Sequence, residues 1–321
     1  MFDITIEQAN RRCERGISML TEIQRLQMLQ CPTHPIDMVL DTDAYNEIDD
    51  QFAIAYAMAA DKLNLKALYA APFDNPMSTG PTDGMEKSYQ EILKLLRLMG
   101  REAPVYRGSD AFMTDEKTPV DSPAVHDLVE RAMQYTWENP LYVVAIGAIT
   151  NIASALLLKP EIADRIVVVW LGGHALEWPH NAEFNLQQDV AAARVVYNSG
   201  APLVLLPCMG VVHAFSTTEP ELNYWLRGKN ALCDYLVDHT VEAANTYAKG
   251  KVWSRAIWDV TAIGWLLNDG DRFMMDKLIH TPIPEYDHHY AEDFRRPLCR
   301  MVYYIHRDAL MGDLFDHISR L

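Results

Sequence analysis

The sequence has few cysteines, and their arrangement builds neither a disulfide framework nor a zinc site. Its five cysteines lie at positions 13, 31, 208, 233 and 299, an odd number without a Cys-x-x-Cys spacing. This usage is typical of reduced thiols in an intracellular protein. We therefore expect a cytoplasmic protein without disulfides or cysteine-bound zinc.

Long apolar runs are missing as well. No run approaches the roughly 20 apolar residues that a membrane-spanning helix needs. Residues 1–26 mix acids and bases from the start, which is not the pattern of a signal peptide. We expect no membrane partner.

Positive charge is scarce relative to negative charge. The chain has 28 Lys and Arg against 44 Asp and Glu, which gives a formal net charge of −16. Such a balance argues against nucleic acid or an anionic membrane as the main partner, because both carry negative charge. Cations and small molecules remain as candidate ligands.

The pattern that is present predicts an α/β fold in a single domain, with a mostly parallel β-sheet flanked by helices. Short apolar runs alternate with longer segments of helical periodicity after Pro35, as in βα units. We divide the chain into an N-terminal helical extension, 1–35, with an amphipathic helix expected within 5–30, and one domain, 36–321. Strands are predicted at 36–41, 65–70, 141–146, 166–171 and 203–207. Helices are predicted at 49–60, 84–98, 122–136, 150–158 and 187–198, and the segment 214–320 is predicted to be more helical.

Oxygen-bearing side chains follow several of these strands. DTDAYNEIDD (41–50) follows the first strand, Asp74 and Asn75 the second, GAITN (147–151) the third, and AEFN (182–185) the fourth. Polar residues at the carboxyl ends of parallel strands converge in one crevice. Hard oxygen ligands favour calcium or magnesium over softer metals. One divalent cation would explain why five acids crowd into ten positions.

These segments resemble the inosine-uridine preferring nucleoside hydrolases, which split the N-glycosidic bond of ribonucleosides. DTDAYNEIDD is similar to the family's DxDxGxDD signature but two residues longer, and GAITN, LGGH, AEFN and the Trp258-Asp259 pair follow in the family's order. The resemblance spans roughly 36–270. It implies the nucleoside hydrolase fold, with a Rossmann-like core, and a homodimer or homotetramer acting on a small-molecule riboside or sugar.

The resemblance also implies roles for individual residues. Asp43, Asp50, the carbonyl of Thr150 and Asp259 would hold Ca²⁺, and Asp43 would be the general base that takes a proton from water. Asp49, Glu183 and Asn185 would bind sugar hydroxyls, with Asp41 in support. Asn75, Asn181 and Trp258 would complete the substrate site.

Three departures touch the substrate side of this site. Trp258 stands where one branch of the family has a histidine that helps the base to leave, and an indole is no general acid at neutral pH. We expect the base to stack on aromatic side chains instead, with Trp178, Trp253, Trp258 and Trp265 as candidates. The segments AAPFDN (70–75), after the second strand, and EWPHN (177–181), after the fourth, also differ from the family pattern.

Other interpretations stay open from the residues alone. The acidic loop could be a solvated turn whose acids complement a helix N-terminus, and Thr150 could be a plain helix cap. His174, His180, His288 and His289 are possible proton donors. The chain could also act on another pentoside, bind calcium and a sugar without hydrolysis, or use its DTD segment as a phosphohydrolase.

Overall fold

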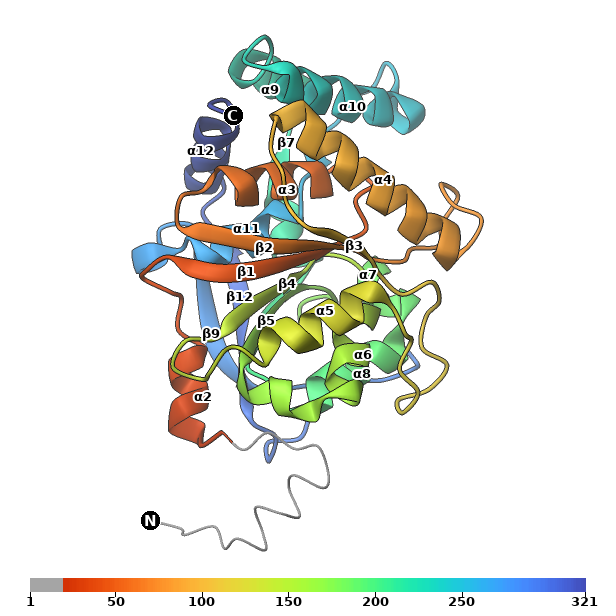
Figure 1. Cartoon of the computed structure of the whole chain (residues 1–321). Coiled ribbons are helices and arrows are strands. Elements are labelled where there is room, and N and C mark those ends of the chain that lie inside the picture. The colour runs from red at the N-terminus through yellow and green to blue at the C-terminus, as the bar shows by residue number, and fades with distance from the viewer. Residues whose placement is uncertain (1–19) are drawn as a thin grey trace, which may run out of the picture.

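The structure is a computed structural model that describes residues 20–321. The helix expected within 5–30 falls largely outside the described residues, which contain only its last part, α2 (Glu22–Met28). Within the described part of the chain, no helix has the length and apolar character needed to cross a membrane. Figure 1 shows the whole arrangement.

Twelve strands and eleven α-helices alternate along the described chain. The strands are β1 (Ile36–Thr42), β2 (Leu63–Ala70), β3 (Val105–Arg107), β4 (Leu141–Ala145), β5 (Ile166–Leu171), β6 (Leu203–Leu206), β7 (Ser216–Thr217), β8 (Arg255–Ala256), β9 (Met274–His280), β10 (Ile283–Pro284), β11 (Tyr290–Ala291) and β12 (Leu298–Ile305). The remaining helices are α3 (Asp50–Ala59), α4 (Pro81–Met99), α5 (Pro123–Ala132), α6 (Thr150–Leu158), α7 (Phe184–Gln188), α8 (Val190–Asn198), α9 (Glu219–Trp225), α10 (Ala231–Ala248), α11 (Val260–Leu266) and α12 (Arg307–Ile318).

The centre of the molecule is an eight-stranded sheet with the order β3-β2-β1-β4-β5-β6-β12-β9. Neighbouring strands are parallel except for β9, which runs antiparallel to β12 at one edge. From β1 the chain adds β2 and β3 on one side and then returns to add β4, β5 and β6 on the other. The order therefore reverses between β1 and β4, which is the point where open α/β sheets bind ligands.

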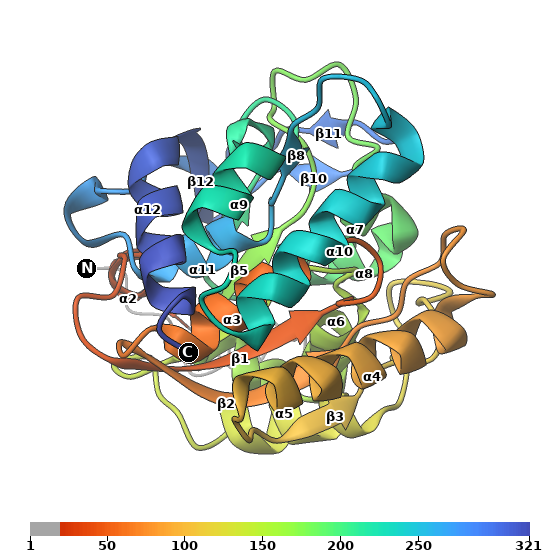
Figure 2. The ribbon, with the colours of Figure 1, turned by 90° about the horizontal axis from the view of Figure 1, so that it is seen from above.

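Helices cover both faces of the sheet, as the apolar strands require. In β1, Met38 and Leu40 join the core under α3, α4, α10, α11 and α12, whereas Val39 joins the core over α5, α6 and α8. A strand buried on both faces reads as one continuous apolar run rather than an alternating one. Figure 2, seen from above, shows α4, α9, α10 and α12 over the first of these faces.

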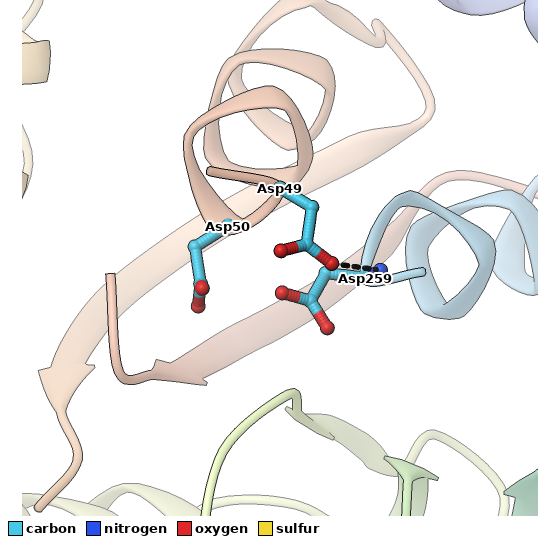
Figure 3. Close-up of side chains that lie close together, drawn as sticks. All are labelled: Asp49, Asp50 and Asp259. Carbon is cyan, nitrogen blue, oxygen red and sulfur yellow. Dashed lines mark hydrogen bonds between the residues drawn. The ribbon is translucent and has the colours of Figure 1, made fainter. Parts of the chain in front are cut away.

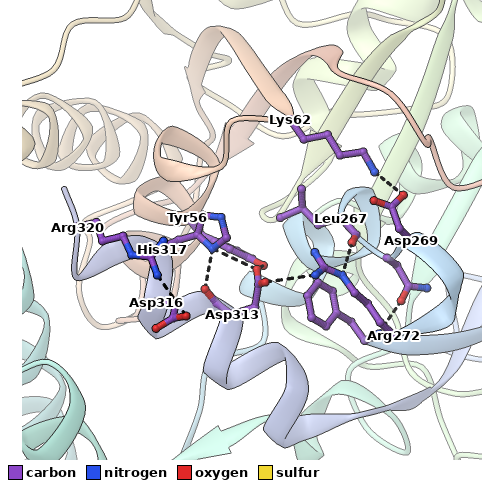
Figure 4. Close-up of polar contacts among 11 residues, drawn as sticks. Tyr56, Lys62, Leu267, Asp269, Arg272, Asp313, Asp316, His317 and Arg320 are labelled. Atoms are coloured by element: carbon purple, nitrogen blue, oxygen red, sulfur yellow. Dashed lines mark hydrogen bonds and ion pairs between the residues drawn. The ribbon is translucent and has the colours of Figure 1, made fainter.

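The C-terminal helix α12 is fastened to α3 by a polar network away from the sheet (Figure 4). The hydroxyl of Tyr56 on α3 donates to Asp313 on α12, and Arg272 and His317 also approach the Asp313 carboxylate. Tyr56 is fully buried, so its hydroxyl depends on this partner. The network therefore links the last helix, α12, to α3.

The α/β fold with one mostly parallel sheet is confirmed, and the five predicted strands are present within one or two residues. Helix 187–198 is instead two helices, α7 and α8, because Asp189 leaves helical geometry at φ −144° and caps α8 by accepting from Ala192 N. α8 ends where expected, with Gly200 at φ +80° beyond it. The segment 214–320 holds α9–α12, but it also supplies β9 and β12, which the expectation of a helical segment missed.

Candidate active site

A cavity of about 430 Å³ lies at the carboxyl ends of the central strands. The loop after β1 contributes most of its acidic wall, Ile146 follows β4, Leu171 ends β5, and Cys208 and Met209 follow β6. These are the strands on either side of the reversal in strand order. The position matches the crevice that the polar strand ends predicted.

Three carboxylates meet at one end of this cavity. An oxygen of each of Asp49, Asp50 and Asp259 lies within 4.8 Å of the others, and all three residues are buried. Asp49 and Asp50 stand at the start of α3, and Asp259 directly precedes α11, whose first turn faces them (Figure 3). The backbone N–H of Asp259 donates to Asp49 Oδ2 at 3.3 Å, which fixes the two segments together. Two sequence-distant acidic positions are thus brought into one group.

Asp43 lines the same cavity, next to these three carboxylates. It is 1% exposed, and its Oδ2 has no hydrogen-bond partner. Its carboxyl lies against Gly147, since a Cβ at that position would come 3.0 Å from Asp43 Oδ1. An unpartnered buried carboxylate oxygen is costly unless a cation or donor meets it. Asp43 is therefore placed for ligand binding, and Gly147 makes the room for it.

Burial governs the protonation of this group. Desolvation raises the pKa of Asp43 and Asp259 well above the usual range, with the neighbouring aspartates as further causes. Burial, followed by the charge of Asp49, raises the pKa of Asp50 to about 8. Burial also raises the pKa of Asp49. A divalent cation would offset this repulsion, and an all-oxygen donor set is the kind that hard cations such as calcium bind. The residues present thus fit a divalent cation.

Hydrogen bonds behind the carboxylates hold them in position. Thr42 Oγ1 donates to Asp50 Oδ1, and Asn151 Nδ2 donates to Asp41 Oδ2 at 2.7 Å. Asn151 in turn accepts from the backbone N–H of Ser109 at 2.7 Å. Asp41 does not line the cavity, and the supporting role expected for it stays a prediction.

Glu183 and Asn185 also line the cavity. Glu183 caps α7 and accepts the backbone N–H groups of Gly173, Asn185 and Leu186. Asn185 Nδ2 donates to the carbonyls of Ile146 and Leu171, both at 3.1 Å, and so ties the ends of β4 and β5 together. Burial raises the pKa of Glu183 to about 7, although its backbone donors lower it. Both residues are fixed by structural contacts and still face the cavity.

Three predicted site residues do not line the cavity. Thr150 is buried, and its hydroxyl donates to Asp189 at 2.7 Å. Asn75 contacts the site indirectly, by donating from Nδ2 to Asn46, which does line the cavity. Asn181 turns its Oδ1 to the backbone N–H of His174, and its Nδ2 is buried without a partner.

Aromatic side chains also line the cavity, and we call this part its aromatic wall. Trp258 and Trp178 line the cavity, together with His174 and His180. The indole N–H of Trp258 donates to His213 Nδ1 at 3.2 Å. Of the other two candidates, Trp265 is fully buried and donates to Asp276, and Trp253 does not line the cavity. The expected stacking surface is thus limited to Trp258 and Trp178.

The imidazole of His174 is a poor proton donor at neutral pH. Burial, and then the neighbouring His180, lowers the pKa of His174 to about 4. Its Nδ1 accepts from the backbone N–H of Met209 at 3.2 Å. His180 lies exposed at the rim. His288 and His289 do not line the cavity.

One ion pair at the site was not predicted from the sequence. Glu47 lines the cavity and pairs with Arg255, whose guanidinium lies over the ring of Trp258 at 5.0 Å from its centroid. Gln51 Nε2 donates to the carbonyls of Ala44 and Glu47 and so fixes the lengthened loop. The extra length of DTDAYNEIDD was the only signal of this arrangement, because 208 residues separate the two partners.

Comparison with known proteins gives consistent matches. Residues 38–294 match the family of inosine-uridine preferring nucleoside hydrolases. The pyrimidine-specific ribonucleoside hydrolase RihA of Citrobacter koseri is 26% identical over 247 residues, which cover 68% of this chain and 76% of the relative. RihA of Klebsiella pneumoniae is 25% identical over 260 residues, covering 72% and 79%.

Solved structures share the fold. The purine-preferring ribonucleoside hydrolase from Gardnerella vaginalis has a TM-score of 0.70 and 22% identity, covering 88% of this chain and 98% of that chain. The type III effector protein XopQ, complexed with adenosine diphosphate ribose, has a TM-score of 0.64 and 19% identity, covering 94% and 99%.

Proposed function

This chain belongs to the inosine-uridine preferring nucleoside hydrolase family and is an N-glycosidase of that type, and from this premise we propose that it hydrolyses a ribonucleoside or related riboside with the help of a calcium ion. The observation that carries the proposal is the group of buried carboxylates at the reversal in strand order, where Asp43 presents an unpartnered oxygen. A cation would offset the repulsion within such a group, and the cavity that it lines has room for a small molecule.

From the family pattern, Asp43, Asp50 and Asp259 would hold the ion. The carboxylates that lie within 4.8 Å of one another are Asp49, Asp50 and Asp259, and Asp43 lines the same cavity. The carbonyl of Thr150 remains a proposed ligand from the family pattern. When bound, calcium would polarise a water molecule and clamp two sugar hydroxyls. Asp43 then accepts the proton of that water, because it is the cavity-lining carboxylate with an unpartnered oxygen.

The sugar would lie between the carboxylates and α7. Asp49 accepts from a ribose hydroxyl, and Glu183 and Asn185 face the remainder of the sugar. As the C1′–N bond breaks, positive charge develops on the sugar ring, and the surrounding carboxylates stabilise it. The water oxygen forms the new bond to C1′, and the bond electrons leave with the base.

The leaving base would stack against Trp258 and Trp178. Asn75 and Asn181 stand behind the cavity wall, where they position Asn46 and the His174 loop rather than contact the base or sugar directly. We further propose a cytoplasmic homodimer or homotetramer.

A second candidate function is calcium-dependent binding of a riboside without hydrolysis, or hydrolysis of a different sugar derivative. Two observations favour keeping it. Trp258 replaces a proton donor and has its N–H engaged by His213. In addition, XopQ, which shares the fold, was solved with adenosine diphosphate ribose.

Turnover of a riboside panel separates these candidates. The calcium-loaded protein is incubated with purine, pyrimidine and other N-ribosides, and reducing sugar is measured alongside ligand binding by calorimetry. Hydrolysis of at least one riboside supports the enzyme. Calcium-dependent binding with no sugar released from any of them would replace it with the binding protein.

A further inference from the structure

The aromatic wall of the cavity offers no proton donor to a departing base. The indole N–H of Trp258 is engaged by His213, and His174 accepts rather than donates at Nδ1. His180 stands exposed at the rim, with its Nδ1 accepting from Ala182 N. A neutral base departs as an anion unless something protonates it or stabilises its charge. Among the described residues, nothing at the aromatic wall is set up to protonate it.

Acidic side chains also outnumber basic ones in the lining of the cavity. Six carboxylates line it, those of Asp43, Glu47, Asp49, Asp50, Glu183 and Asp259. A bound divalent ion and Arg255 would supply three positive charges. Burial raises the pKa of all six carboxyl groups, to about 7 for Glu47, so further positive charge in the cavity would favour their ionised forms. A cationic ligand is therefore favoured over a neutral one, and an anionic ligand is disfavoured.

The extra carboxylate of the lengthened loop strengthens this preference where the base would lie. Glu47 lines the cavity, whereas its partner Arg255 lies outside the lining and covers Trp258. The ligand therefore meets the carboxylate of this ion pair rather than the guanidinium. The aromatic face of Trp178 is in addition suited to a cation, whereas Arg255 already lies over the ring of Trp258.

Resting on the proposed function, we propose that the preferred substrate is a cationic N-riboside, such as a ribosylated pyridinium, whose base departs as a neutral molecule. Water adds to C1′ and gives its proton to Asp43, while the C1′–N electron pair returns to the ring nitrogen and cancels its positive charge. The products are ribose, the neutral base and one proton. No proton donor for the leaving group is required.

Nicotinamide riboside and uridine test the inference, because the first carries a fixed positive charge on a six-membered ring and the second is neutral. Values of kcat/KM are measured for both with the calcium-loaded wild type and with Glu47→Gln, Glu47→Asp and Glu177→Gln. Glu177 is an exposed carboxylate on the same loop as Trp178, outside the cavity lining, and serves as the matched control. The chemical lability of each nucleoside cancels when two enzymes are compared on the same substrate.

We expect the wild type to prefer nicotinamide riboside by at least tenfold. Glu47→Gln should lose at least five times more kcat/KM on nicotinamide riboside than on uridine, Glu47→Asp should keep the preference, and Glu177→Gln should change neither substrate. Turnover of uridine with no preference for the cation, or equal losses on both substrates in Glu47→Gln, would overturn this inference and leave the proposed function standing. Absence of turnover on every riboside would overturn both.

Discussion

Asp43 is the residue on which the proposed chemistry depends most. We predict that Asp43→Asn lowers kcat/KM for any accepted riboside by ~10²–10⁴-fold, the range for loss of a general base. The fold should survive, because the change removes a buried charge with an unpartnered oxygen and leaves side-chain volume nearly unchanged. Steady-state kinetics and thermal unfolding measure the two effects. Asp61→Asn, at an exposed turn, is the matched control. An Asp43→Asn enzyme with wild-type activity would show that Asp43 is not the general base.

His174 provides a pH test that is independent of the carboxylates. Its folded-state pKa, lowered by burial to about 4, lies below the ordinary value of ~6.5, so protonation favours the unfolded chain. Stability from the neutral imidazole is therefore complete above about pH 6.5 and is lost as the pH falls toward 4. We predict that the wild type loses more Tm between pH 7 and pH 5 than His174→Gln does. Parallel Tm curves for the two proteins would contradict the lowered pKa.

Among individual residues, the acidic side chains of the site could be predicted from the sequence, but the ion pair of Glu47 could not. One cavity is lined by Asp43, Asp49, Asp50 and Asp259. Each follows a strand or begins a helix, and the predicted order of strands and helices is enough to bring such positions together. The Glu47–Arg255 pair joins segments far apart in the chain, so no local pattern predicts it.

The turn after β4 lies against the carboxyl group of Asp43. A Cβ at Gly147 would lie 3.0 Å from the Asp43 carboxyl and 3.2 Å from the Ala71 Cβ. We predict that Gly147→Ala displaces Asp43 and weakens calcium binding by at least tenfold, as measured by calorimetry. Gly312→Ala on α12 is the control, since nothing lies within 4 Å of its added methyl and helix propensity favours alanine by ~1 kcal/mol. Unchanged calcium affinity in Gly147→Ala would argue against the close approach of Asp43 to this turn.

The second element is α12, which is held to α3 by the hydrogen bond from Tyr56 to Asp313. We predict that Asp313→Ala lowers the free energy of unfolding by ~1–3 kcal/mol, because the buried Tyr56 hydroxyl loses its acceptor. Activity well below the Tm should persist, since neither residue lines the cavity. Urea unfolding measures the change. Asp316→Ala, in an exposed ion pair on the same helix, should stay within ~0.5 kcal/mol of the wild type, and equal losses in both variants would refute the role of the network.

Elements with a strong apolar signal were the predictable ones. β4, β5 and β6 are buried at every position and read as continuous apolar runs, and most of β1 and the second half of β2 are buried too, so the positions of these five strands follow from the sequence. β9 and β12 have exposed residues at irregular intervals, and their pairing at the sheet edge comes from contacts that no local periodicity reveals.

For the whole molecule, one sheet brings together acids that are more than two hundred residues apart. The reversal of strand order places the β1 loop beside the β4 turn, and α11 delivers Asp259 to the same point. The net charge of −16 agrees with a protein that binds a cation at its centre. Fold, charge and site thus support the central claim of our proposal, that this cavity hydrolyses a riboside only when it holds calcium.

The measurement that tests this claim most directly is riboside turnover before and after removal of the metal, with metal content followed by native mass spectrometry. The protein is stripped with chelator, assayed, and assayed again after one equivalent of calcium is restored, beside Asp259→Asn as a variant with a weakened site. We predict loss of turnover on stripping, recovery with one bound calcium per chain, and little recovery in Asp259→Asn. Full turnover by protein that carries no metal would contradict the account.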